Sequence, residues 1–241
     1  MASKIFITGD THGKIDIEKI YNRSFKAAKL LTKDDILIIA GDAGIIWDGF
    51  TRKNNIANRD RRIIDIYERR PFTTAFVDGN HENHQAISKY PIEDWNGGKI
   101  HRISPSVIHL MRGECYIINN KKFFIMGGAD SIDKIWRQTQ FMMTGDVSWW
   151  PEEMPSNEEY EHAKATIAKN NNQFDYIITH CASTDIQKRL HPEYKKDDLT
   201  DFFNIIENEV TFKQWFFGHY HEDINVDNQH TCIYKKIIQV I

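Results

Sequence analysis

The stretch "KIFITGDTHG", residues 4–13, joins an apolar run of strand length to a short loop that carries Asp10 and His12. The same arrangement recurs in four other stretches: "DILIIAGDAG" (35–44), "TTAFVDGNHE" (73–82), "FDYIITHCAS" (174–183) and "WFFGHYHE" (215–222). Short runs rich in Ile, Phe and Val that end at Gly or a polar residue are typical of buried strands followed by loops. Open α/β sheets bind ligands beyond the carboxyl ends of their strands, so we expect these loops to form one site.

The five loops offer eight polar side chains: Asp10, His12, Asp42, Asn80, His81, His180, His219 and His221. Taken singly, an Asp beside Gly is also an ordinary turn residue, and a His at a strand end is often only a hydrogen-bonding residue. Together, imidazole, carboxylate and amide oxygen suit divalent transition ions, and eight groups are too many for one ion. Two ions that share a carboxylate can generate a hydroxide for in-line attack on phosphorus. The set therefore indicates metal-assisted hydrolysis.

The order of these motifs along the chain resembles that of the calcineurin-like metallophosphoesterase family. The series is D-x-H, G-D, G-N-H-E, a lone His after a strand, and G-H-x-H, starting at residues 10, 41, 79, 180 and 218. All five blocks occur in the family's order and span nearly the whole chain. The resemblance implies an α/β fold in which two mixed β-sheets pack as a sandwich flanked by helices.

The resemblance also implies a role for each of the eight side chains. One metal would be held by Asp10, His12 and His221. A second would be held by Asn80, His180 and His219, and Asp42 would bridge the two. His81 would lie off the metals, contact the phosphate and protonate the leaving oxygen, which requires reach to that oxygen.

The composition frames this prediction. The chain has 241 residues without a Pro/Gly/Ser-rich linker, which predicts a single domain over residues 1–241. A formal charge of −3 does not favour duplex nucleic acid as a partner, but does not exclude nucleic acid. The three scattered cysteines fit a reduced intracellular protein. We find no signal peptide and no apolar run long enough to cross a membrane, so we expect a cytoplasmic protein. The ligand set accommodates Mn, Fe, Zn, Ni or Co, with Mn as the ion to supply in vitro; the oligomeric state stays open.

Several helices are expected between the strands. Apolar spacing predicts helices over 16–31, about 54–69 and about 199–208, and a further helix opening at Ser156 with Glu159 in a capping box. Two strand-like runs around Asn119 and Asn120 predict a hairpin. The arginines between 59 and 70 are interpreted as the solvated face of the second helix rather than as a patch for an anionic polymer.

An unusual segment at about 130–155, "DSIDKIWRQTQFMMTGDVSWWPEEMP", should leave the sheet on the same edge as the ligands. We call it the Trp-rich excursion. Its aromatic and methionine side chains would either form a pliable wall for a ligand or pack the segment onto the body. Arg137 and Lys134 are its candidates for holding a phosphate oxygen, and a bidentate Arg suits that task better.

The substrate is expected to be a phosphodiester or phosphomonoester of a small molecule or nucleotide. The chain departs from the serine/threonine protein phosphatases of the resembled family, which continue the second block as G-D-x-x-D-R-G where this chain has "GDAGIIWDG". Asp48 or Glu82 is a candidate to orient His81 instead. A protein phosphatase and a catalytically silent scaffold remain as alternatives, although a scaffold should have lost ligands and this chain retains the whole set.

Overall fold

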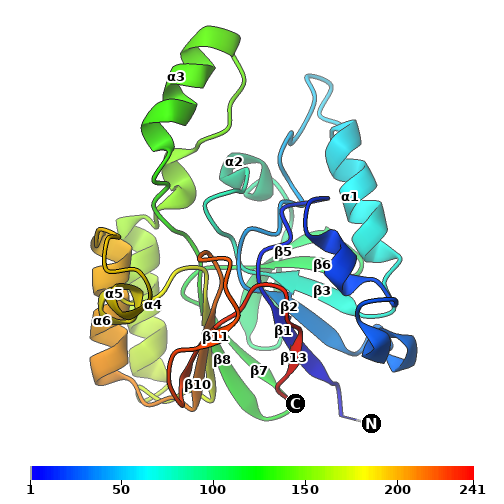
Figure 1. The fold of residues 1–241 in the computed structure, drawn as a ribbon. Coiled ribbons are helices and arrows are strands. Elements are labelled where there is room, and N and C mark those ends of the chain that lie inside the picture. The colour runs from blue at the N-terminus through cyan, green and yellow to red at the C-terminus, as the bar shows by residue number, and fades with distance from the viewer. Residues whose placement is uncertain (1) are drawn as a thin grey trace.

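Two mixed β-sheets form the centre of the protein in a computed structural model that describes residues 2–241 (Figure 1). The seven-stranded sheet runs, in spatial order, β13 (Ile238–Gln239), β1 (Ile5–Thr8), β2 (Ile36–Ile39), β3 (Thr73–Phe76), β6 (Val107–Leu110), β5 (Gly98–Ser104) and β4 (Ile92–Trp95). The six-stranded sheet runs β11 (Ile224–Asn225), β12 (His230–Cys232), β10 (Gln214–Phe217), β9 (Tyr176–Thr179), β8 (Lys121–Met126) and β7 (Cys115–Ile118).

Parallel strands occupy the middle of each sheet. In the first sheet β1, β2, β3 and β6 are parallel, and in the second β8, β9, β10 and β12 are parallel. The strands at the sheet edges pair antiparallel. The five strands expected before the motifs are therefore β1, β2, β3, β9 and β10, and the α/β prediction with two mixed sheets is confirmed.

Alternation along β1 shows how the layers are held together. Ile5 and Ile7 belong to a buried cluster that includes Phe123 and Phe216 of the second sheet, so they face the space between the sheets. Phe6 points to the other side and packs with residues of the helical layer. A strand covered on both faces has no polar side, which explains the continuous apolar runs in the sequence.

Helices cover the outer faces of both sheets (Figure 1). Their bounds are α1 (Asn58–Glu68), α2 (His84–Ile87), α3 (Lys134–Thr144), α4 (Asn157–Lys169), α5 (Thr184–Leu190) and α6 (Asp198–Glu209), with 3₁₀ segments η1 (Ile17–Ile20), η2 (Lys26–Leu30) and η3 (Pro151–Glu153). Helix α3 stands away from the sheets at the top of Figure 1. Within residues 2–241, no helix combines the length and apolar character needed to cross a bilayer.

The helix predicted over 16–31 is wrong, because the chain forms η1 and η2 with a turn between them. The apolar residues 17 and 20, and then 25, 28 and 31, recur every three positions, which suits 3₁₀ geometry better than the α-helix. Helix α1 begins at Asn58, later than predicted, because Asn54 has a left-handed backbone and Ile56 forms a β-bridge with Phe50. The capping box of Ser156 and Glu159 is confirmed, as are helix α6 and the hairpin of β7 and β8.

Candidate metal centre

Four of the predicted ligands have a backbone conformation that side chains rarely adopt. Ten non-glycine residues among 2–241 have positive φ, and six of them are asparagines. The other four are His12 (φ 43°), Asp42 (47°), His219 (68°) and His221 (54°). Such conformations cost on the order of 1–3 kcal/mol each and cluster at functional sites. The strained backbone of the motif loops is therefore consistent with a functional role for these four side chains.

Two motif glycines allow the loops to approach one another. A Cβ atom on Gly79 would lie 2.1 Å from Asp42 Oδ1, and one on Gly218 would lie 2.2 Å from Asp10 Oδ1. Any side chain at either position would push a carboxylate out of place. The Gly of G-N-H-E and the Gly of G-H-x-H are thus required by close packing against the ligands from other strands.

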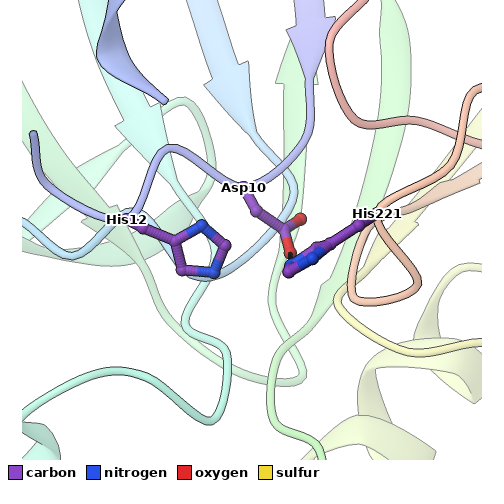
Figure 2. Close-up of side chains that lie close together, drawn as sticks. All are labelled: Asp10, His12 and His221. Atoms are coloured by element: carbon purple, nitrogen blue, oxygen red, sulfur yellow. Dashed lines mark ion pairs between the residues drawn. The ribbon is translucent and has the colours of Figure 1, made fainter. Parts of the chain in front are cut away.

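Asp10, His12 and His221 come together from the loops after β1 and β10 (Figure 2). Asp10 Oδ2 lies 3.2 Å from His221 Nε2, and the rings of His12 and His221 are 5.0 Å apart. Asp10 is fully buried, and within residues 2–241 its Oδ2 makes no hydrogen bond beyond this contact with His221. A buried carboxylate oxygen whose polar neighbour is an imidazole of the same predicted ligand group fits a metal ligand.

Asp42 lies between the two predicted ligand groups. Its Oδ1 accepts a hydrogen bond from the backbone N–H of His81 at 2.7 Å. Its Oδ2 lies 3.5 Å from His12 Nε2 and 3.3 Å from His180 Nε2. Asp42 Oδ2 thus faces one imidazole from each predicted ligand group, as expected of a carboxylate that bridges two metals.

Hydrogen bonds fix the orientation of both imidazoles that face Asp42. His12 Nδ1 donates to Asp16 Oδ2, and His180 Nδ1 donates to the carbonyl of Ala40, each at 3.0 Å. Both rings therefore present Nε2 to the centre. Metal-ligating histidines are usually held in this way through their second ring nitrogen.

Asn80 and His219 complete the second group around His180. Asn80 Oδ1 lies 3.2 Å from His180 Nε2, and the rings of His180 and His219 are 5.0 Å apart. Burial lowers the pKa of His219 to about 3, so its imidazole is neutral and keeps a lone pair for a metal. The structure therefore brings the seven predicted metal ligands to one place.

The charges of this centre suit a divalent cation. Burial opposes ionisation of Asp42, but His180 and His12 outweigh it and hold the pKa of Asp42 well below its usual range. The pKa of His180 is raised to about 10 despite burial, because Asp42 is so close. The carboxylate of Asp42 thus favours positive charge beside it, as a divalent cation would supply. The donor set of carboxylates, imidazoles and one amide oxygen fits two divalent ions.

His81 lies beside the centre and is contacted by Arg137. Arg137 Nη2 is 3.1 Å from His81 Nδ1 and 3.0 Å from His81 Nε2, and the Arg137 side chain is buried. The indole of Trp47 lies nearly parallel to the His81 ring, and Trp150 packs edge-on against Trp47. Burial and the nearby Arg137 lower the pKa of His81, although Asp42 opposes the shift.

The candidates for orienting His81 do not contact it. Asp48 is exposed, and Glu82 accepts a hydrogen bond from the backbone N–H of Gly44 instead. Lys134 Nζ lies over the ring of Trp149 and 3.9 Å from Asp130, so the structure gives it no contact with the predicted ligands.

The Trp-rich excursion leaves the end of β8 as expected, but most of its apolar side chains do not form a wall at the site. Trp136 is 61% exposed and Met142 is 85% exposed, and Phe141 and Met143 are exposed as well. Trp150 is the buried member, and its partner Trp47 comes from the loop after β2. The aromatic surface beside His81 is therefore built from Trp47 and Trp150.

Sequence reasoning missed several residues that support the site. Asp16 orients His12, and its spacing of four residues from that histidine was a usable signal. Ser131 and Glu153 form hydrogen bonds behind Asn80. No periodic pattern connects these two positions to Asn80, because they meet only through the fold.

A sequence model of calcineurin-like phosphoesterases matches residues 3–223 of the chain. No individual curated protein matches it. The match covers most of the sequence and includes all five motif loops, so the chain belongs to the calcineurin-like phosphoesterase family. Members of this family are hydrolases that act on phosphoric esters in a metal-dependent reaction.

Proposed function

We propose that this phosphoesterase hydrolyses a phosphodiester or phosphomonoester of a small molecule or nucleotide with two divalent ions. Asp10, His12 and His221 would hold one ion, and Asn80, His180 and His219 the other. The observation that carries the proposal is the position of Asp42 Oδ2, within 3.5 Å of both His12 Nε2 and His180 Nε2. Bound ions of this kind acidify water and neutralise charge on phosphate oxygens. We propose Mn as the ion to supply in vitro.

His81 and Arg137 are proposed to act on the substrate itself. Arg137 Nη2 approaches both ring nitrogens of His81, but a neutral imidazole has only one acceptor nitrogen. The ring therefore cannot accept a hydrogen bond from Nη2 at both positions. Arg137 Nε already donates to Asp133 Oδ1 at 2.8 Å; a phosphate oxygen would give the Nη2 group a charged acceptor of its own and would place negative charge beside His81. That charge counters the lowered pKa of His81 and favours the protonated ring, which then donates its proton to the leaving oxygen.

A cavity that shares Trp47 with the surroundings of His81, but is not lined by His81 itself, supports an ester with a sizeable organic group. This cavity of about 630 Å³ is lined by Trp47 and Trp150, with Asp48, Asn83 and Lys89 among its polar groups. Trp47 is also the residue whose ring lies parallel to His81. A leaving group protonated by His81 would extend into this cavity, and flat aromatic walls with a few polar groups suit a nucleoside or another aromatic group.

A cytoplasmic location is part of the proposal. It is supported by the three cysteines, Cys115, Cys181 and Cys232, which are free and buried. Free thiols of this kind are typical of reducing compartments.

The test is hydrolysis of bis-p-nitrophenyl phosphate beside p-nitrophenyl phosphate by Mn-loaded protein, with Asp42→Asn as the blank. Diester cleavage that is lost in the blank would support a phosphodiesterase, whereas cleavage of the monoester alone would identify a phosphatase. If the metal-loaded protein cleaves neither ester nor any nucleotide or phosphopeptide, the catalytic proposal fails in favour of a silent scaffold.

A further inference from the structure

The side chain of Asn80 is held on both sides by buried polar groups. Its Oδ1 faces His180 Nε2 at 3.2 Å, on the side of the candidate metal centre. Its Nδ2 donates to Ser131 Oγ at 3.0 Å on the opposite side. Ser131 is buried, and so is Glu153, whose carboxylate contacts Ser131. The two ends of the Asn80 amide are therefore in different environments.

Ser131 has a single hydroxyl proton, and the partners of the hydroxyl group determine where that proton points. Ser131 Oγ donates to Glu153 Oε2 at 2.6 Å, while the backbone N–H of Ser131 donates to Glu153 Oε1 at 3.0 Å. Since a carboxylate can only accept, the hydroxyl proton points to Glu153 and leaves a lone pair for Asn80. If the Asn80 amide turned over, its oxygen would face that lone pair and its NH₂ group would face the metal centre. An NH₂ group offers no lone pair to a metal.

Both supporting residues belong to the Trp-rich excursion, one near each end of it. We propose that Ser131 and Glu153 are positioning residues that fix the Asn80 amide with its oxygen toward the second metal. The inference rests on the proposed two-metal function. It gives the excursion a role at the metal centre in addition to carrying Arg137.

The sharpest single change is Glu153→Gln, which keeps the shape of the side chain and reverses the hydrogen-bond direction. The backbone N–H of Ser131 still requires an oxygen, so the new NH₂ group would donate to Ser131 Oγ. The hydroxyl proton would then point to Asn80 and favour the overturned amide. We expect the Mn²⁺ affinity of one of the two sites to fall by about ten- to a hundredfold, as for other residues behind metal ligands.

The measurement is calorimetric titration of metal-free protein with Mn²⁺. The matched control is Glu152→Gln, because the side chain of Glu152 only pairs with the exposed Gln85 and should leave both affinities unchanged. Ser131→Ala removes the acceptor and should weaken the same site, whereas Ser131→Thr keeps the hydroxyl and should bind like wild type. These two variants test the inference independently if Glu153→Gln does not fold.

A reversed pair provides a positive test. Asn80→Asp places a carboxylate beside Ser131, whose one proton cannot serve both it and Glu153. In Asn80→Asp with Glu153→Gln, the new amide donates to the hydroxyl and the hydroxyl donates to the new carboxylate. The double variant should therefore bind Mn²⁺ more tightly than the two single effects combined would allow. A merely structural role for Glu153 would give additive effects.

Wild-type affinity in Glu153→Gln and Ser131→Ala, or strict additivity in the double variant, would overturn the inference. The proposed function fails separately: it is wrong if Asn80→Ala still binds two ions as wild type does. Loss of one ion in Asn80→Ala, with normal binding in Glu153→Gln and Ser131→Ala, would refute only the roles of Ser131 and Glu153.

Discussion

Asp42 and Asp78 are two buried aspartates that follow neighbouring parallel strands, β2 and β3, and their surroundings differ. Asp78 Oδ2 accepts a hydrogen bond from Arg112 Nε at 2.8 Å. Asp78 Oδ1 also lies 3.0 Å from His109 Nε2. Asp42 Oδ2 faces the imidazoles of His12 and His180, but no arginine within residues 2–241 pairs with Asp42. Both residues are buried aspartates shortly after a strand, and the arginine is the difference between their side-chain partners.

The partners decide what each carboxylate can do. Arginine stays protonated in proteins, so Arg112 neutralises Asp78 permanently and leaves no place for a metal. An imidazole can give up its proton and offer a lone pair, so the surroundings of Asp42 can exchange protons for a metal. The backbone differs as well, because Asp42 has a left-handed conformation and Asp78 does not. We therefore regard Asp42 as functional and Asp78 as structural.

The largest effect should come from Asp42→Asn. It removes the negative charge that both ligand groups share, so we expect hydrolysis of p-nitrophenyl esters to fall roughly a thousandfold or more. The assay is the initial rate with Mn²⁺ supplied, and circular dichroism provides the control for folding. Activity within a few fold of wild type would remove Asp42 from the centre of the mechanism.

The same substitution at the other aspartate should act on stability. Asp78→Asn leaves the buried Arg112 with the partly exposed Glu159 as its remaining counter-ion, so the free energy of unfolding should drop by about 3 kcal/mol, the lower end of the range for a broken buried ion pair. Urea unfolding of metal-free protein measures this, with Asp42→Asn beside it. Asp42→Asn should lose less, since His180 can discharge and Arg112 cannot. If Asp42→Asn lost more stability than Asp78→Asn, our distinction between a functional and a structural aspartate would be wrong.

His81→Asn should separate chemistry from metal binding. We expect turnover to fall by about a hundredfold, the lower end of the range for a proton donor, with the metal content unchanged. His162→Asn, the same change at an exposed histidine, serves as the control. Loss of bound metal in His81→Asn would show that His81 is a ligand.

The smallest effect concerns pH and the surroundings of Asp78. His101 contacts His109, which lies 3.0 Å from Asp78, and burial together with His109 lowers the pKa of His101 to about 4. Between pH 6.5 and 4 the unfolded chain then binds a proton that the folded protein does not, so stability decreases as the pH falls. In His101→Gln this decrease should be shallower, by up to about 1 kcal/mol per pH unit. The free energy of unfolding is measured against pH by urea unfolding in EDTA. If it falls equally with pH in wild type and His101→Gln, the lowered pKa of His101 is contradicted.

Much of the fold could be predicted because the information is local. A strand buried on both faces must be apolar throughout, and a loop at its end shows its polar residues directly, so β1, β2, β3, β9 and β10 were visible in the sequence. Over residues 16–31 the local pattern is misleading, because apolar residues spaced by three predict an α-helix where the chain forms two 3₁₀ segments. Tertiary contacts were beyond reach: nothing near Arg137 indicates that it meets His81, and nothing near Glu153 indicates that it supports Asn80.

The central claim is that the centre around Asp42 holds two divalent ions, and counting them tests it most directly. Protein stripped with EDTA, reloaded with Mn²⁺ and freed of excess ion by gel filtration should contain about two ions per chain by elemental analysis. Asp42→Asn should contain fewer, and Asp78→Asn that remains folded should match wild type. A wild-type protein that retains no ion, or one that retains the same number as Asp42→Asn, would contradict the account.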